Sequence, residues 1–171
     1  AACAVGVYPD ARLDSIVEGL ENARAGEMRM QSFQTASGVF VLNDAYNANP
    51  TSMRAAIETL ADMSGEGRKV AVLGDMAELG SLTELAHFRI GEEVARLPID
   101  VLVTVGPRAR RIGEGARAEG MESEKIRPCS TAEEASEVLD DVIEAGDMVL
   151  VKASRVMGLE RIVEGIVHPR V

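Results

Sequence analysis

Three short polar segments hold the side chains with which this sequence could carry out chemistry. Residues 43–49 contain one carboxylate, one phenol and three amides, and residues 74–80 contain two acids between two glycines. Residues 152–155 read Lys-Ala-Ser-Arg, which places two cations and a hydroxyl at the expected start of a helix. Backbone N–H groups at a helix start favour an anion. A carboxylate or a phosphate would therefore suit the last segment.

Each segment also has an ordinary structural interpretation. Asn and Asp bond to their own backbone and cap helices, so residues 43–49 are also typical of a turn. The acids between the glycines of residues 74–80 could belong to a plain loop, and Lys152 and Arg155 could pair with surface acids. His87 lies on an expected helix and has no evident catalytic partner. On these patterns alone, both interpretations stay open.

The elements that position these segments alternate regularly along the chain. Strand-like runs that are apolar without alternation, such as residues 101–105 and 148–151, are typical of a parallel sheet covered by helices on both faces. The sequence therefore predicts an α/β fold with a doubly wound, mostly parallel sheet. In such sheets ligands bind at the carboxyl ends of the strands, where the three polar segments lie. The expected strands are residues 39–42, 69–73, 101–105, 125–128 and 148–152, and the expected helices are residues 50–63, 82–97, 107–118, 131–145 and 155–167.

Helix starts are indicated at three places. Asn49 can cap a helix that has Pro50 at its first position, where the missing N–H is not needed. Ser-x-x-Glu spacing at residues 81–84 and 130–133 predicts two capping boxes, in which side chains and backbone donors satisfy one another.

Composition narrows the class of protein. The chain has 171 residues, of which 46% are hydrophobic and 27% charged, as in an ordinary globular domain. Its 28 acids against 18 bases give a formal charge of −10, which disfavours general binding to nucleic acids or anionic membranes. Cys3 and Cys129 cannot build a disulfide framework, and two thiols fit a cytoplasmic protein. No apolar run reaches the length of a membrane span.

The three polar segments together resemble one family. Asp-Ala-Tyr-Asn-Ala-Asn-Pro-Thr-Ser-Met, Gly-Asp-Met-Ala-Glu-Leu-Gly and Lys-Ala-Ser-Arg occur in this order at strand ends, which resembles the C-terminal domain of Mur ligases. The nearest branch adds D-alanyl-D-alanine to UDP-N-acetylmuramoyl-tripeptide in peptidoglycan precursor synthesis. The resemblance covers residues 29–171, and residues 1–28, with an expected helix at 12–23, resemble the tail and connector of the family's central ATPase domain. Ala153 departs from the family's usual Lys-Gly-Ser-Arg.

The resemblance implies a cytoplasmic, ATP-dependent amide-bond ligase. ATP phosphorylates the terminal carboxylate of the tripeptide, and the amine of D-alanyl-D-alanine attacks the resulting acyl phosphate. By similarity, the residues facing ATP are Arg29, which reaches the phosphates, Asp44, which contacts the ribose, and Tyr46, Asn47 and Asn49 beside them. The residues expected at the dipeptide are Lys152, Ser154 and Arg155, with Asp75, Glu78 and His87 near the cleft.

The same resemblance implies that further domains are needed. No Gly-x-x-x-x-Gly-Lys-Ser/Thr phosphate loop occurs in the chain, which also begins without Met, so we expect a piece of a longer enzyme. In the family, the phosphate loop and the Mg²⁺ ligands belong to the central domain, and the nucleotide-sugar pocket belongs to an N-terminal domain. We therefore expect no metal ligands and no certain catalytic residue in this chain, which would be inactive alone. It would close on its missing domains about a pivot near residues 25–29.

Non-catalytic alternatives come from other classes of protein. A receiver-like signalling module needs a phosphorylated Asp at the carboxyl end of its middle strand, whereas Asp100 precedes the expected strand. A dinucleotide-binding module needs Gly-x-Gly-x-x-Gly after the first strand, but Gly113 and Gly115 fall inside an expected helix. A purely structural interaction domain is the third alternative.

Overall fold

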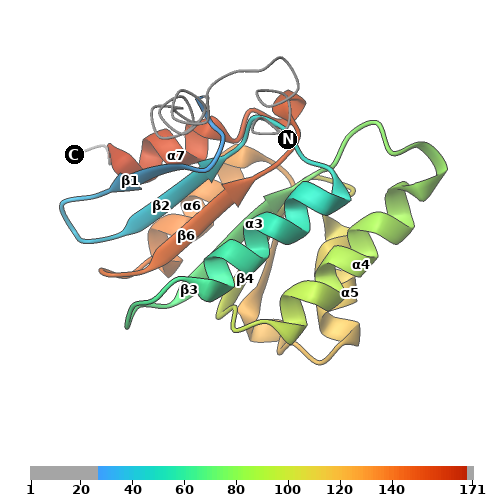
Figure 1. Ribbon diagram of the computed structural model, residues 1–171, viewed down its shortest axis with the longest axis horizontal. Helices are drawn as coiled ribbons and strands as arrows, with labels where there is room; N and C mark the ends of the chain where they lie inside the picture. Colours follow the sequence, from blue (N-terminus) through green and yellow to red (C-terminus); the bar gives the residue numbers. More distant parts are fainter. Residues whose placement is uncertain (1–26, 169–171) are drawn as a thin grey trace, which may run out of the picture.

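A single six-stranded sheet organises the domain in the computed structural model, which describes residues 27–168. The strand order is β1-β2-β6-β3-β4-β5 (Figure 1). β1 pairs antiparallel with β2 at one edge, and every other neighbouring pair is parallel. The strands are β1 Gln31–Gln34, β2 Phe40–Asp44, β3 Lys69–Gly74, β4 Val101–Val105, β5 Ile126–Cys129 and β6 Met148–Lys152.

Helices cover both faces of the sheet. α3, α4 and α5 pack on one face, and α6 and α7 pack on the other (Figure 1), so the predicted doubly wound, mostly parallel fold is confirmed. Each face has its own buried apolar cluster, and all five residues of β6 are buried, because helices cover that strand on both sides. The helices are α3 Pro50–Asp62, α4 Thr83–Arg96, α5 Arg110–Ala118, α6 Ala132–Val142 and α7 Glu160–Val167, with short 3₁₀ turns at Gly80–Leu82, Ser123–Lys125 and Arg155–Met157.

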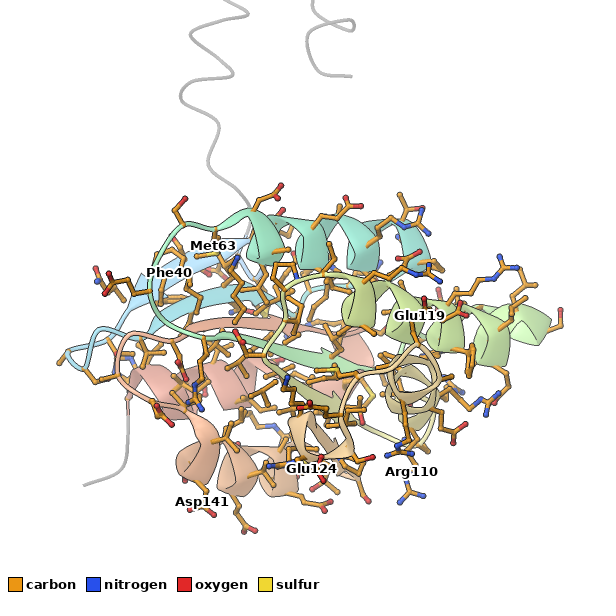
Figure 2. All side chains as sticks on the ribbon, turned by 90° about the horizontal axis from the view of Figure 1, so that it is seen from below. Phe40, Met63, Arg110, Glu119, Glu124 and Asp141 are labelled. Carbon is orange, nitrogen blue, oxygen red and sulfur yellow. The ribbon has the colours of Figure 1, made fainter. Side chains whose placement is uncertain are left out.

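The polar surface surrounds this layered core. Figure 2 shows Arg110, Glu124 and Asp141 pointing outward from the helical layers, whereas Phe40 and Met63 lie against the apolar cluster beneath α3. No helix in residues 27–168 is long and apolar enough to cross a membrane. The expected helix at 12–23 lies outside the described residues, and the boundary between residues 1–28 and 29–171 stays a prediction.

The predicted helix starts have mixed outcomes. Asn49 caps α3 as predicted: its side chain accepts a hydrogen bond from the Ser52 N–H at 2.9 Å, and Pro50 is the first helical residue. The capping box at residues 81–84 is wrong, because a 3₁₀ turn leads into α4 and no side chain caps it. The cap of α6 is Thr131 rather than Ser130, and Thr131 accepts from the Glu134 N–H at 3.2 Å.

The last predicted helix is interrupted. Residues 155–157 form a 3₁₀ turn that ends at Gly158, and α7 starts at Glu160. Gly158 has a φ of +61°, a left-handed backbone conformation that stops a helix and that glycine adopts readily.

Candidate functional site

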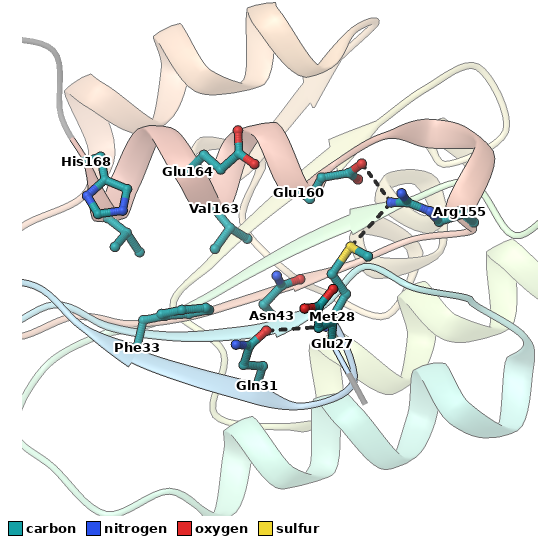
Figure 3. A pocket seen from close by; sticks show the side chains of 11 residues that line it. Glu27, Met28, Gln31, Phe33, Asn43, Arg155, Glu160, Val163, Glu164 and His168 are labelled. Atoms are coloured by element: carbon teal, nitrogen blue, oxygen red, sulfur yellow. Dashed lines mark hydrogen bonds and ion pairs between the residues drawn. The ribbon is translucent and has the colours of Figure 1, made fainter. Parts of the chain in front are cut away.

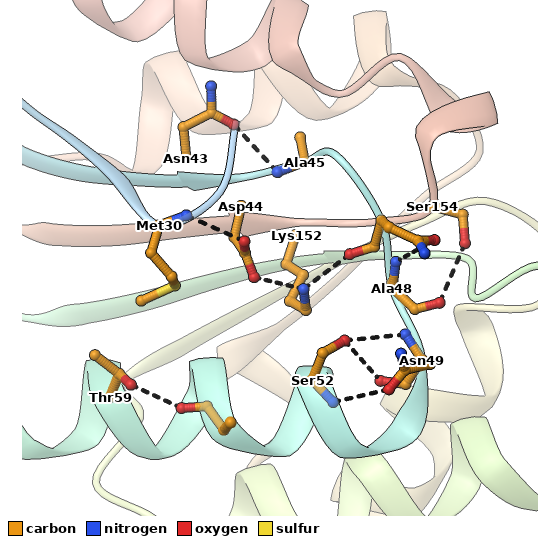
Figure 4. Close-up of polar contacts among 12 residues, drawn as sticks. Met30, Asn43, Asp44, Ala45, Ala48, Asn49, Ser52, Thr59, Lys152 and Ser154 are labelled. Atoms are coloured by element: carbon orange, nitrogen blue, oxygen red, sulfur yellow. Dashed lines mark hydrogen bonds and ion pairs between the residues drawn. The ribbon is translucent and has the colours of Figure 1, made fainter. Parts of the chain in front are cut away.

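The carboxyl ends of the parallel strands bring the three polar segments together at one edge of the sheet. Ser154 connects all three, since its hydroxyl accepts a hydrogen bond from the Ala77 N–H at 2.7 Å and lies 3.5 Å from the Ala48 carbonyl oxygen (Figure 4). The Ser154 N–H also donates to the Asp75 carbonyl at 3.0 Å. Segments that are more than 70 residues apart in sequence therefore form one surface.

An ion pair between Asp44 and Lys152 occupies the centre of this edge. The two residues are register partners on β2 and β6, so their side chains lie next to each other on the α3 face of the sheet (Figure 4). Lys152 Nζ donates to Asp44 Oδ2 at 2.5 Å and to the Asn47 carbonyl at 2.9 Å. Lys152 is only 1% exposed. The structure thus joins two residues that the sequence analysis assigned to different ligands, and the ligand of each stays a prediction.

The connector that enters the domain lies directly on this pair. Asp44 Oδ1 accepts a hydrogen bond from the Met30 N–H at 3.1 Å, and the Tyr46 N–H donates to the Met28 carbonyl at 3.1 Å. Between these contacts the Arg29 guanidinium lies 4.2 Å from the centre of the Tyr46 ring, and both side chains are exposed. Met28 and Met30 have φ values of +56° and +50°, which non-glycine residues rarely adopt. These contacts by backbone groups of the connector were not predicted, because no pattern of side chains in the sequence indicates them.

Asn47 and Asn49, which the sequence predicts to face ATP, make local hydrogen bonds of the kind that the turn interpretation predicts. Asn47 Oδ1 accepts from the Ala48 N–H at 2.8 Å, and Asn49 Oδ1 accepts from the Ser52 N–H. Both residues remain exposed on the loop between β2 and α3. They therefore shape the loop while still facing solvent at the candidate site.

Asp75 and His87 are buried and bonded to backbone groups. Asp75 Oδ1 accepts from the N–H groups of Arg108 and Ala109 at 3.0 and 2.7 Å, which fixes the loop before α5. His87 is fully buried, its Nε2 accepts from the Met76 N–H at 2.9 Å, and Nδ1 lies 2.7 Å from the Thr83 carbonyl oxygen. This pattern corresponds to a neutral imidazole with its proton on Nδ1. The structure therefore shows both side chains supporting the loops of the site.

Glu78 and Arg155 are the exposed members of the set predicted at the dipeptide. Arg155 Nη1 pairs with Glu160 Oε1 at 2.7 Å and lies 3.3 Å from the Met28 sulfur. It stands at one end of a groove of about 440 Å³ between β1 and α7 (Figure 3). The groove is acidic, because it is lined by Glu27, Met28, Gln31, Phe33, Asn43, Arg155, Glu160, Val163, Glu164, Val167 and His168.

Ala153 does not project into the site. Its side chain is fully buried in the apolar cluster beneath α6 and α7, on the opposite face of the sheet from Asp44 and Lys152. A Cβ on Gly74 would lie 2.6 Å from the Ala153 Cβ, so the neighbouring strand accommodates the alanine methyl by having glycine there. The extra methyl group of Ala153, compared with glycine in the usual motif, therefore packs in the core and does not enter the site.

Comparison with known protein families and curated proteins gives consistent matches. Residues 28–155 match the family described as "Mur ligase, glutamate ligase domain". The UDP-N-acetylmuramoyl-tripeptide--D-alanyl-D-alanine ligase of Bacillus subtilis is 36% identical over 168 residues, which cover 98% of this chain and 36% of that protein. The Escherichia coli protein of the same name is 41% identical over 112 residues, which cover 66% of this chain and 24% of that protein.

Solved structures show the same similarity. A crystal structure of MurF from Acinetobacter baumannii superposes with a TM-score of 0.83 at 33% identity, covering 96% of this chain and 35% of that one. MurF from Thermotoga maritima in complex with ADP gives a TM-score of 0.74 at 29% identity, covering 94% of this chain and 35% of that one. The chain therefore spans about a third of the length of these relatives.

Proposed function

Because the chain belongs to the Mur ligase family, we propose that it is the C-terminal domain of an ATP-dependent ligase that joins D-alanyl-D-alanine to UDP-N-acetylmuramoyl-tripeptide. Relatives named for this ligase activity or as MurF are similar to this chain over nearly its whole length. The observation that carries the proposal is the assembly of Arg29, Asp44 and Tyr46 into one wall at the carboxyl edge of the sheet, with Arg29 and Tyr46 exposed and Asp44 partly accessible. The proposal places the enzyme in the cytoplasm, where ATP is available.

The wall has the chemistry that a nucleotide needs. The Asp44 carboxylate accepts bonds from Lys152 and from the Met30 N–H, and a carboxylate has about four lone-pair sites, so it retains acceptors for ribose hydroxyls. Its side chain is 14% exposed. Beside it, Arg29 offers a guanidinium suited to phosphate, and Asn47 and Asn49 complete the exposed loop.

ATP, when bound, supplies the phosphoryl group that activates the carboxylate of the tripeptide. Residues 27–168 contain no group of three or more His, Cys, Asp or Glu side chains that could hold a metal ion. We place the Mg²⁺ ligands, the phosphate loop and the nucleotide-sugar pocket in the domains that complete the enzyme. Closure of this domain would bring its wall onto the nucleotide and reduce the access of water.

Of the polar residues near the proposed dipeptide position, some are exposed and can reach the ligand, and the others support the surrounding loops. Arg155 is the exposed cation that we assign to the dipeptide carboxylate. It is paired with Glu160 near the surface, so it can exchange this partner for the dipeptide at little energetic cost. Glu78 is exposed on the neighbouring loop. Ser154, Asp75 and His87 are bonded within the domain and shape the loops around that position.

The test is a ligation assay with the full-length protein. UDP-N-acetylmuramoyl-tripeptide, ATP, Mg²⁺ and D-alanyl-D-alanine are incubated with it, and the product is identified by mass spectrometry together with released ADP and phosphate. We expect one pentapeptide product and one phosphate per ADP. L-Alanyl-L-alanine serves as the matched control and should give little product, and residues 1–171 alone should give none. Equal turnover of both dipeptides, or product formed by residues 1–171 alone, would contradict the proposal.

A further inference from the structure

We propose that Lys152 is a positioning residue for the nucleotide wall, acting through Asp44 instead of touching the dipeptide. This inference rests on the proposed function only in naming the ligand of the wall as ATP. The structure places Lys152 Nζ within hydrogen-bond distance of Asp44 and of the Asn47 carbonyl. These are the two ends of the four-residue turn, residues 44–47, that carries Asp44 and Tyr46 of the wall.

The burial of Lys152 leaves it little access to a ligand. The residue is 1% exposed, and its ammonium points at the carboxylate from the neighbouring strand (Figure 4). An ammonium has three donors, and two of them are used by groups of the turn. The third donor is as buried as the rest of the residue, so a dipeptide has almost no access to it, whereas Asp44 itself has exposed surface. The geometry therefore favours an indirect role.

The contacts beyond Asp44 extend this role to the rest of the wall. The carboxylate that Lys152 holds also accepts a hydrogen bond from the Met30 N–H, and the N–H of Tyr46, two residues further on, donates to the Met28 carbonyl. Arg29 lies between these two anchors and rests on the Tyr46 ring. Removing the ammonium would leave Asp44 as a largely buried carboxylate without its cation, which is strongly unfavourable unless the side chain moves toward water. Such a movement would break the Met30 contact directly and remove one of the two anchors that hold the connector on the turn.

The other end of the same strand provides a matched control. Asp147 directly precedes β6, its side chain is 2% exposed, and it is paired with Arg68 at 2.8 Å. Like Lys152, Arg68 binds a buried carboxylate and a backbone carbonyl, that of Val142. This pair lies at the amino end of the strand and contacts none of the residues predicted to bind ligands. Its loss should reduce stability alone.

The experiment compares Lys152→Met, Asp44→Asn, their double variant and Arg68→Met in the full-length enzyme. Michaelis constants for ATP and D-alanyl-D-alanine, calorimetric binding of a non-hydrolysable ATP analogue, and melting temperature are measured for each. Lys152→Met should weaken nucleotide binding about tenfold or more, the effect of losing one charge-assisted hydrogen bond, and should change the dipeptide constant less than about twofold. The double variant should bind nucleotide about as weakly as Asp44→Asn alone, because both changes act on one group.

Arg68→Met should lower the melting temperature with both Michaelis constants unchanged, because it leaves the buried Asp147 carboxylate, which lies outside the site, without its cation. A raised dipeptide constant with unchanged analogue binding in Lys152→Met would overturn the proposal, as would a double variant whose effect is the product of the single effects. Failure of the proposed function would appear differently, as absence of product in the wild-type enzyme. The binding measurements would still decide the role of Lys152 in that case.

Discussion

Replacing Gly74 by alanine tests how the core sets the position of the site. Gly74 ends β3 immediately before Asp75, and a Cβ built there would lie 2.6 Å from the Ala153 Cβ and 3.0 Å from Leu159 Cδ1. Carbon atoms pack best at about 3.5–4.0 Å, so about 1 Å of separation is missing at the first contact. Leu159 can rotate its terminal methyl away, but the Ala153 Cβ is fixed to a central strand. The two strand ends would therefore have to move apart.

The loss of stability expected for Gly74→Ala depends on how far the neighbouring atoms can move. Overpacking a core usually destabilises by about 1–3 kcal/mol, and the rigid contact places Gly74→Ala near the upper end. Ala153→Gly alone removes one buried methyl and adds backbone freedom, together about 1–2 kcal/mol. In the double variant the contact at 2.6 Å no longer exists, so the second substitution should cost at least about 1 kcal/mol less than it does alone.

Urea unfolding of residues 1–171 and of the two single variants and the double variant, the four members of this double-mutant cycle, measures the effect. We expect a favourable coupling of at least about 1 kcal/mol between the two positions. Free energies of unfolding that add to within about 0.5 kcal/mol would refute the contact, and with it the explanation of why alanine is tolerated at residue 153.

Three further tests address other parts of the structure. His87→Leu should lower the free energy of unfolding by about 1–3 kcal/mol, because a buried backbone N–H loses its acceptor; a higher dipeptide Michaelis constant with unchanged stability would restore a substrate role. Gly115→Ala should destabilise by about 3 kcal/mol because its Cβ would lie 2.0 Å from the Phe88 carbonyl oxygen, whereas Gly165→Ala, with open space around it, should be neutral or stabilising in the same urea assay. Burial raises the pKa of the Cys129 thiol to about 11, so its alkylation by iodoacetamide, followed by peptide mass mapping, should stay slow at pH 8 and accelerate only near that pKa or on unfolding; fast labelling of the folded chain at pH 8 would contradict its burial.

The cysteine also gives stability a pH dependence. An ordinary thiol in the unfolded chain ionises near pH 8.5, whereas folded Cys129 keeps its proton up to about 11. The unfolded state therefore binds fewer protons between these values, and this group's contribution to stability falls as the pH rises through that window.

The fold was predictable because strong local signals agree with it. The apolar runs that became β4 and β6 have no alternation, which already indicates burial on both faces, and Asn49 with Pro50 marks the start of α3 correctly. The prediction of a helix start failed at Ser130 because the similar residue Thr131 caps α6 instead. It failed at residues 81–84 because a 3₁₀ turn leads into α4 without a side-chain cap.

The candidate site was predictable in its residues but not in their pairing. Strand ends rich in polar groups identify the edge of the sheet, and the resemblance to a family selects the residues. Whether Asp44 meets Lys152 depends on β6 inserting between β2 and β3, a long-range arrangement that no local pattern encodes. The left-handed backbone of Met28 and Met30 is set in the same way by contacts with the Asp44 to Tyr46 turn.

Photolabelling of the full-length enzyme with 8-azido-ATP tests most directly whether the carboxyl edge of this domain faces the nucleotide. The label is activated by light in the presence and absence of excess ATP, and modified peptides are identified by mass spectrometry. We predict ATP-protected labelling within the peptide that contains Tyr46, because that exposed ring lies with Arg29 on the proposed wall. Protected labelling that falls only at the amino edge of the sheet, or on no residue of this domain, would contradict the account.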